Sequence, residues 1–287
     1  MRCGYCDFNT YTSTQLGEGA TPESYVDTAL RELAFMPERQ VRALSGIAAH
    51  GGLAPDAEVT TEANPDSVTP ASLTELRAGG FNRISFGMQS AVPHVLAMLD
   101  RTHEPANVPR AVAWAREAGF DEISVDLIYG SPTESVEDWR RTVNAALELE
   151  PDHISAYALI VEEGTAFARK VRSGQVTMPD DDETSEKYLL ADEAFEAAGL
   201  SWYELSNWAK PGSASRHNLG YWNGSEWWGI GPGAHSFLHG RRWWNVKHPL
   251  AYAQRLEAGQ SPEADGEIPS ETERHLEDVM LRLRLRE

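Results

Sequence analysis

The amino-acid sequence predicts an α/β fold, a partial (β/α) barrel, followed by a tryptophan-rich α+β region. From about residue 57, short β-like runs alternate with amphipathic helical stretches. Glycines stand where several of these helices should end, before the next strand begins. After about residue 175 the alternation gives way to a glycine-rich span crowded with tryptophan. Alternating β and α units imply parallel strands with helices packed outside them, as in an open sheet or a barrel.

The β and α units are expected in the following order. The β-like runs lie at residues 57–62, 83–89, 122–128 and 153–159. The helical stretches lie near residues 70–79, 92–99, 106–118 and 135–149. Gly79-Gly80 and Gly119 stand at the ends of two of these helices, where a left-handed backbone conformation commonly stops a helix.

Polar residues fall at the carboxyl ends of three of the expected strands. They are Glu62, Gln89 and Asp126. Ligands of open α/β sheets and of barrels sit at the carboxyl ends of the strands. A solvated turn explains any one of these residues, but three on one rim indicate a binding site.

The second half of the chain has a different character. An acidic connection at residues 179–185 is expected to be exposed and to cap a helix at about 183–198. A polar loop at residues 260–270 and a helix to the end of the chain should follow. We therefore expect two domains, an incomplete barrel over residues 1–175 and a C-terminal region over residues 176–287. The tryptophans of this part are Trp202, Trp208, Trp222, Trp227, Trp228, Trp243 and Trp244.

The composition predicts an ordinary globular protein of the cytoplasm. Hydrophobic residues make up 41% and charged residues 24% of the 287 positions. No stretch approaches the ~20 apolar residues that span a bilayer, and no secretory signal is visible. The net charge of −19, from 44 acidic and 25 basic residues, argues against a nucleic-acid surface, because phosphate binding needs clustered Lys and Arg.

The two cysteines, Cys3 and Cys6, suggest a metal or redox site. A disulfide framework is not expected in a cytoplasmic chain with a single pair so close together. A thioredoxin-like site needs a strand before the first cysteine, and a zinc ribbon needs a second pair of ligands. Three cysteine thiolates can hold three irons of a 4Fe-4S cluster. Two cysteines alone leave each of these sites incomplete.

The residues around the cysteines resemble the second half of the radical-SAM signature, C-x3-C-x2-C, in the form found in the haem-handling branch of that family. The stretch reads Arg2-Cys3-Gly4-Tyr5-Cys6-Asp7-Phe8-Asn9. In that family three cysteines bind a 4Fe-4S cluster whose fourth iron holds S-adenosylmethionine (SAM), which is cleaved to a deoxyadenosyl radical. The resemblance implies that Cys3 and Cys6 are metal ligands and that Tyr5 packs against SAM.

The resemblance continues from residue 57 to about residue 245. It implies four further SAM contacts, which are Glu62, Gln89, Arg101 and Asp126. A carboxylate can accept hydrogen bonds from ribose hydroxyls or from the methionyl ammonium, and a guanidinium can bind the methionyl carboxylate as a fork. On the residues alone, a surface salt bridge also explains Arg101, and a helix cap or turn also explains Asp126.

Two later segments resemble the haem chaperones of this branch. Residues 216–222 resemble their His-Asn-x-x-Tyr-Trp segment, and residues 229–237 resemble their Gly-x-Gly-x-x-Ala-His-Ser segment. Histidine can ligate haem iron and aromatic faces can pack on a porphyrin, so the resemblance implies a haem-binding role for His217. The other interpretation is a core of aromatics with a hydrogen-bonded histidine.

The sequence departs from the family pattern in two places. The first cluster cysteine would lie four residues before Cys3, ahead of Met1. The family's Gly-Gly-Thr-Pro strand, which holds the methionyl part of SAM, has no counterpart in residues 34–47. We therefore expect a radical-SAM barrel with missing strands, produced by truncation, by internal deletion or by a misassigned start.

Three functions remain open on the sequence. The first is a haem chaperone that binds a 4Fe-4S cluster, SAM and haem, and delivers haem to recipient proteins. The second is an oxygen-independent coproporphyrinogen III oxidase of porphyrin biosynthesis. That oxidase carries a further cysteine where this chain has Phe8, so the resemblance favours the chaperone. The third is an inactive remnant. No residue is assigned a catalytic role, and enzyme activity is left open.

Overall fold

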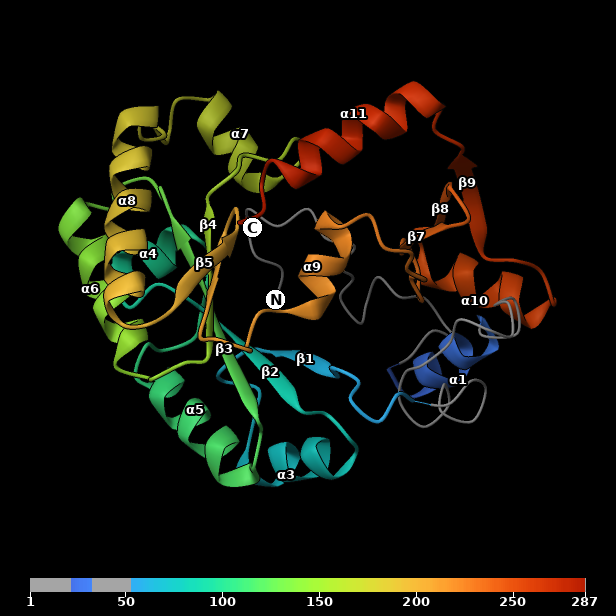
Figure 1. Ribbon diagram of the computed structural model, residues 1–287, viewed down its shortest axis with the longest axis horizontal. Coiled ribbons are helices and arrows are strands. Elements are labelled where there is room, and N and C mark those ends of the chain that lie inside the picture. The colour runs from blue at the N-terminus through green and yellow to red at the C-terminus, as the bar shows by residue number, and fades with distance from the viewer. Residues whose placement is uncertain (1–21, 33–52, 287) are drawn as a thin grey trace. The chain divides into compact units, whose positions relative to one another are not determined.

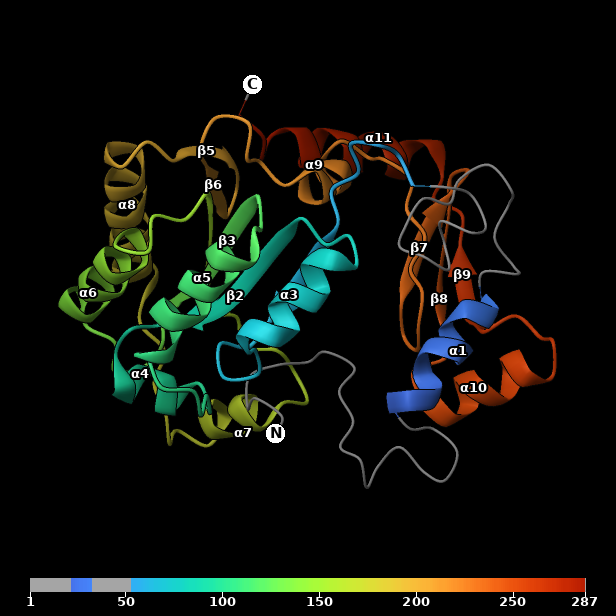
Figure 2. The ribbon, with the colours of Figure 1, turned by 90° about the horizontal axis from the view of Figure 1, so that it is seen from below.

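The computed structural model describes residues 22–32 and 53–286, which pack as two compact units. The six-stranded unit comprises residues 58–216 together with 285–286. The three-stranded unit comprises residues 22–32, 53–57 and 217–284. Figures 1 and 2 label the helices and strands of both. The domain division at residue 175 stays a prediction.

The six-stranded unit is built on one mixed sheet in the order β1-β2-β3-β4-β6-β5. The first four strands pair in parallel, whereas β6 pairs antiparallel with both β4 and β5. All carboxyl ends of the parallel strands therefore meet at one edge of the sheet. The strands are β1 (Thr60–Ala63), β2 (Arg83–Gln89), β3 (Glu122–Tyr129), β4 (His153–Ala158), β5 (Ser201–Glu204) and β6 (Asn207–Ala209).

Helices connect the parallel strands and cover the outer side of the sheet (Figures 1 and 2). Local sequence sets their ends. Helix α3 starts with a capping box at Thr69 followed by Pro70, α6 starts with a capping box at Ser135, and α5 stops at Gly119, where φ is +85°. The helices are α3 (Pro70–Ala78), α4 (Pro93–Met98), α5 (Asn107–Ala118), α6 (Val136–Leu147), α7 (Ala166–Arg172) and α8 (Asp181–Ala197).

The core of this unit lies between the sheet and these helices. Because side chains alternate along a strand, β2 places Ile84, Phe86 and Met88 in the core and Ser85 and Gln89 on the opposite face. The opposite face is polar, and it is the face that holds the strand-end residues selected from the sequence.

The three-stranded unit contains an antiparallel sheet in the order β7-β8-β9. Helix α1, from the first described segment, packs against α10, so distant parts of the chain form this unit. From His217 onward, α9 also belongs to it. The elements are α1 (Pro22–Glu32), α9 (Arg216–Trp222), β7 (His235–Leu238), β8 (Arg241–Asn245), α10 (Pro249–Glu257), β9 (Glu263–Glu267) and α11 (Glu271–Arg282).

A buried carboxylate joins α1 to the rest of the three-stranded unit. Glu32 is 1% exposed and accepts hydrogen bonds from the Gly231 amide at 2.8 Å and from Asn245 Nδ2 at 2.6 Å. The Tyr252 hydroxyl of α10 donates a third. Burial raises the pKa of Glu32, while these hydrogen bonds oppose that rise.

The structure confirms the predicted fold class and corrects parts of the second half. The expected strands and helices between residues 57 and 159 are present, and the α+β character of the tryptophan-rich region is confirmed. Residues 260–270, expected to form a loop, include strand β9. The expectation for residues 34–47 lies outside the described residues.

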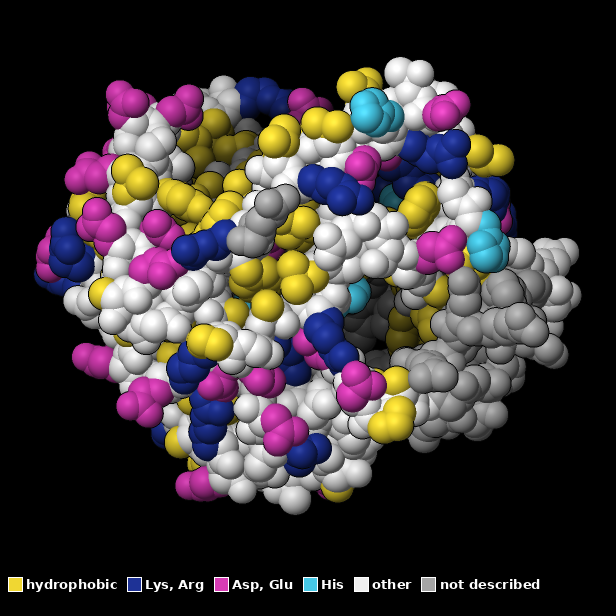
Figure 3. Space-filling view, viewed as in Figure 1, with side chains coloured by type: hydrophobic (Ala, Val, Ile, Leu, Met, Phe, Trp, Pro, Cys, Tyr) yellow, Lys and Arg dark blue, Asp and Glu magenta, His cyan; other side chains and the backbone are white. Residues whose placement is uncertain are grey.

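Charged side chains of both signs lie on the face shown in Figure 3. On the face shown in Figure 3, acidic side chains are spread widely with basic ones among them, in keeping with a net charge of −19. Over residues 22–32 and 53–286, no helix has the length and apolar character needed to cross a membrane.

Candidate functional site

The candidate site lies on the polar face of the six-stranded sheet, toward the carboxyl ends of β1 and β2, with Asp126 inside β3 in register with Gly87. Glu62 on β1 is in register with Ser85 on β2, and the Ser85 hydroxyl donates to Asp126 Oδ1 on β3 at 2.9 Å. A second serine, Ser155 on β4, is in register with Asp126 and also hydrogen-bonds its carboxylate. Ser85 therefore lies between two carboxylates.

These two carboxylates perturb one another. Burial raises the pKa of Asp126, and the hydrogen bonds from Ser85 and Ser155 oppose that rise. Desolvation, followed by the nearby charge of Asp126, raises the pKa of Glu62 to about 7, while Arg83 opposes this shift. At neutral pH the pair therefore carries less than its full negative charge, and a cation bound beside it would favour ionisation of both carboxylates.

The end of β2 departs from regular strand geometry. A register shift between Gly87 and Gln89 marks an irregularity in the pairing with β3. Gln89 has φ of +61°, and the Ser90 amide donates to the Met88 carbonyl at 2.7 Å across it. A hydrogen bond between residues i and i+2 around a positive φ defines a γ-turn of the rare, strained form. Gln89 itself is 9% exposed.

Arg101 reaches the same place from the end of α4. Asp100 takes φ of +52°, its amide donates to Ala97 O at 3.2 Å, and the Arg101 amide donates to Leu96 O at 2.9 Å. These are the hydrogen bonds of a Schellman motif, which ends the helix and turns the chain back. The Arg101 guanidinium then donates through Nη2 to the Gly87 carbonyl at 3.0 Å.

The absence of a side chain at Gly87 lets the side chains of Gln89 and Arg101 approach the backbone of β2. A Cβ atom at Gly87 would lie 2.8 Å from Gln89 Nε2 and 3.1 Å from Arg101 Nη2. Any larger residue would displace the amide or the guanidinium, so the glycine permits close approach of both donors. The structure thus brings together Glu62, Gln89, Arg101 and Asp126, as two acceptors and two donors on one edge of one sheet.

Sequence reasoning missed the serines that hold Asp126. Ser85 on β2 and Ser155 on β4 point to the polar face of the sheet, and each lies two residues along its strand from another residue of that face. The period-two alternation of a strand could have placed them, since Ser155 shares its face with His153 and Tyr157.

His217 lies in the three-stranded unit, at the start of a series of contacting rings. Its ring meets Tyr221 edge-on with centroids 4.7 Å apart, and Tyr221 meets Trp227 in the same way at 4.7 Å. Trp227 in turn contacts Phe237 at 5.3 Å. His217 itself is exposed. A solvent-facing imidazole beside aromatic rings can present a nitrogen to the iron of a haem, and those rings can pack against its porphyrin.

Three predicted site residues, Cys3, Tyr5 and Cys6, lie outside the described residues. In the part of the chain that the structure describes, no group of three or more His, Cys, Asp or Glu side chains is arranged to hold a metal ion. The roles expected of Cys3, Tyr5 and Cys6 therefore stay predictions from the sequence.

Comparisons with known proteins agree on one family. The pattern of the radical SAM superfamily matches residues 19–146. The chain is 47% identical to the heme chaperone HemW of Mycobacterium tuberculosis over 309 residues, covering 100% of this chain and 79% of that protein. It is 32% identical to the heme chaperone HemW of Bacillus subtilis over 98% of this chain and 80% of that protein.

A solved structure shows the same fold. The coproporphyrinogen III oxidase HemN of Escherichia coli, described as a radical SAM enzyme, superposes with a TM-score of 0.79 at 20% identity. The match covers 99% of this chain and 72% of that one. At this identity the likeness concerns the fold alone.

Proposed function

Because this chain belongs to the HemW haem-chaperone family of the radical-SAM superfamily, we propose that it binds a 4Fe-4S cluster, SAM and haem, and passes haem to recipient proteins. The observation that carries the SAM part is the grouping of Glu62, Gln89, Arg101 and Asp126 at the carboxyl edge of the sheet. Membership in the family supports the cluster and the haem.

The four residues fit the polar groups of SAM. Glu62 and Asp126 offer acceptors for an ammonium or for ribose hydroxyls, and the perturbed pKa of Glu62, about 7, marks a place where a bound cation would be favourable. Gln89 and Arg101 offer donors for a carboxylate. Gly87, which has no Cβ, lets both donors lie close to the backbone of β2. When bound, the cluster would supply the electron that cleaves the sulfonium bond.

Cys3 and Cys6 are the proposed cluster ligands, with Tyr5 beside SAM. Their spacing within Cys-Gly-Tyr-Cys supports this assignment. The proposed haem contact is His217, supported by its exposed ring and by the aromatic side chains that follow it.

One experiment separates the possible functions. The chain is reconstituted anaerobically with iron and sulfide, and then assayed for SAM binding, haem uptake and coproporphyrinogen decarboxylation. A chaperone takes up haem and shows no decarboxylation. Decarboxylation at useful rates would replace the chaperone assignment by the oxidase. Failure to take up cluster, SAM and haem would identify an inactive remnant.

The role of His217 is tested by haem titration of the His217→Ala variant. We expect the Soret band of the bound haem to shift or weaken, because an axial nitrogen is lost. His239→Ala is the matched control, since His239 lies in the same unit with its side chain 71% exposed. Identical haem spectra for both variants and the unmodified chain would exclude His217 as a ligand.

A further inference from the structure

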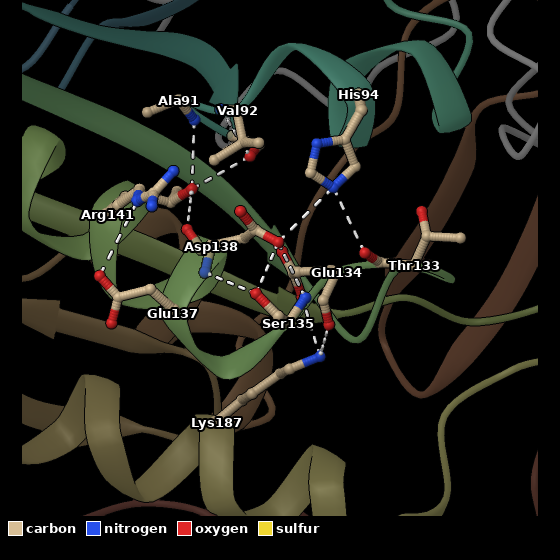
Figure 4. Close-up of polar contacts among 12 residues, drawn as sticks. Ala91, Val92, His94, Thr133, Glu134, Ser135, Glu137, Asp138, Arg141 and Lys187 are labelled. Carbon is tan, nitrogen blue, oxygen red and sulfur yellow. Dashed lines mark hydrogen bonds and ion pairs between the residues drawn. The ribbon is translucent and has the colours of Figure 1, made fainter.

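The γ-turn at Gln89 is held from behind by a hydrogen-bond network that reaches α6. Ser90 and Thr142 are each fully buried, and their hydroxyl oxygens lie 3.0 Å apart. The Ala91 amide donates to Thr142 Oγ1 at 3.2 Å, and the Val92 amide donates to Ser90 Oγ at 3.1 Å. Figure 4 shows Ala91, Val92 and Asp138, with the dashed lines of this network running between them.

The proton positions in this network follow from the atoms available. The Thr142 hydroxyl donates to the Asp138 carbonyl at 3.1 Å, which can only accept. Thr142 Oγ1 must therefore accept the proton of the Ser90 hydroxyl, in addition to accepting from the Ala91 amide. Each hydroxyl then both donates and accepts, and these hydrogen bonds fix the chain that leaves the turn to α6.

A histidine holds the other side of the turn. His103 is 4% exposed, and its Nε2 lies 3.1 Å from the Met88 carbonyl, the same oxygen that accepts the turn's own hydrogen bond from Ser90. A carbonyl only accepts, so Nε2 carries the proton. Burial, and then the nearby Arg101 charge, lower the pKa of His103, which favours the neutral ring.

We propose that Ser90, Thr142 and His103 are positioning residues, which hold Gln89 in its strained turn and so direct its amide toward bound SAM. The proposal rests on the SAM site proposed above. Backbone strain persists only where the surroundings enforce it, and it gathers at ligand-binding sites. Without these three contacts, Gln89 would relax toward extended geometry and its amide would move away from Gly87.

The test is a double-mutant cycle on SAM affinity, measured by equilibrium dialysis with the full chain after anaerobic cluster reconstitution. Thr142→Val replaces the hydroxyl by a methyl group of similar size, and we expect it to weaken SAM binding about tenfold, which is roughly 1.4 kcal/mol. In the Gln89→Ala background the same substitution should change affinity by less than about twofold, because its effect runs through Gln89. Thr142→Ser should restore binding.

Thr74→Val is the matched control. Thr74 is an exposed helix threonine whose hydroxyl donates to the Pro70 carbonyl four residues earlier, as Thr142 does to Asp138. It should leave SAM affinity unchanged. Hydrogen exchange gives a readout without ligand, since the Ser90 amide should exchange faster in Thr142→Val than in Thr74→Val.

The outcomes distinguish this proposal from the proposed function. If Gln89→Ala binds SAM as the unmodified chain does, Gln89 is no SAM contact and the site assignment fails. If Gln89→Ala weakens binding but Thr142→Val does not, or if the two effects simply add, the positioning role is overturned.

A stability comparison keeps the proposal testable if Thr142→Val fails to fold. Glycine in a strand is normally less stable than alanine, but a φ of +61° reverses that preference. We therefore expect Gln89→Gly to melt at a higher temperature than Gln89→Ala. The opposite order would show that the turn stores no strain.

Discussion

At the scale of single residues, the carboxylate pair Glu62 and Asp126 should make stability depend on pH. In the folded protein the pKa of Glu62 is about 7, against 4.5 for the same group in water. Between those values the folded chain keeps a proton that the unfolded chain has lost. Stability therefore falls as pH rises across that window, because the folded state binds more protons than the unfolded state.

Glu62→Gln is expected to remove that dependence. The amide imitates the protonated carboxyl and does not titrate. The difference in melting temperature between Glu62→Gln and the unmodified chain should therefore move in favour of the variant as the pH is raised from 4.5 to 7.5. Glu62 keeps an exposed surface, so solvent screening will make the effect smaller than the pKa shift alone implies. Thermal unfolding at several pH values measures it, with the exposed Glu75→Gln as control. A constant difference between Glu62→Gln and the unmodified chain would contradict the shift.

The site could be predicted in part from the sequence at this scale. Strand ends in an α/β pattern selected Glu62, Gln89 and Asp126, and the structure places them together. The conformation of Gln89 could not be predicted, since a positive φ at glutamine has no local signature. Thr142 stands 52 positions from Ser90, so only the folded chain reveals their pairing.

At the scale of elements, a buried ion pair joins the segment after β3 to α8. Lys187 on α8 is 0% exposed and donates through Nζ to the Glu134 carbonyl at 2.7 Å. Its Nζ also lies 3.3 Å from the Glu134 carboxylate and 2.9 Å from that of Glu183. Figure 4 shows Lys187 reaching up to Glu134. Burial raises the pKa of Glu134, and the charge of Lys187 opposes that rise.

Lys187→Met should destabilise the protein by about 3–5 kcal/mol, because it leaves the Glu134 carboxylate buried without its partner. Adding Glu134→Gln should recover part of that loss, since the stranded charge is then removed. Urea unfolding measures both.

The matched control for Lys187→Met is Lys170→Met. Lys170 forms a 3.8 Å ion pair with Asp100 but is 40% exposed, so its loss should cost no more than about 1 kcal/mol. If both substitutions lowered the free energy of unfolding by the same amount, the buried ion pair would contribute no more to stability than the exposed one. A double variant less stable than Lys187→Met would contradict the stranded-charge explanation.

The elements of the first half could be predicted because long periodic patterns and caps agree there. Gly119 was expected to end a helix and does so in the structure, and the helix expected at about 135–149 begins after the capping box at Ser135. Strand β9 was missed because Glu-Ala-Asp-Gly-Glu has little β propensity. It pairs with β8 through the tertiary fold, where Arg242 meets Glu267 at 2.9 Å.

At the scale of the whole molecule, the chain folds as two units, and the three-stranded unit is formed by residues that come both before and after residues 58–216 in the sequence. Helix α1 precedes the six-stranded unit in the chain yet packs against α10 of the three-stranded unit. The packing of α1 against α10 could not be predicted from the sequence, because nothing near Glu32 distinguishes it from an ordinary charged helix residue. Its partners Gly231, Asn245 and Tyr252 lie some 200 positions later.

Glu32→Gln should loosen the three-stranded unit before the six-stranded unit. The amide nitrogen of glutamine replaces one carboxylate oxygen, and its N–H groups face the Gly231 and Asn245 groups that already donate there. At least one buried group therefore loses its hydrogen-bond partner, which costs about 1–3 kcal/mol of stability. Hydrogen exchange followed by mass spectrometry should show faster exchange over residues 217–284 and little change over β1–β4.

Two control variants accompany this measurement. Asp27→Asn, on the exposed side of α1, should change exchange in neither unit. Lys187→Met should give the reverse pattern, with faster exchange first around α6 and α8. If Glu32→Gln instead accelerated exchange equally in both units, the carboxylate would be stabilising the chain as a whole, and α1 would not be specific to the three-stranded unit.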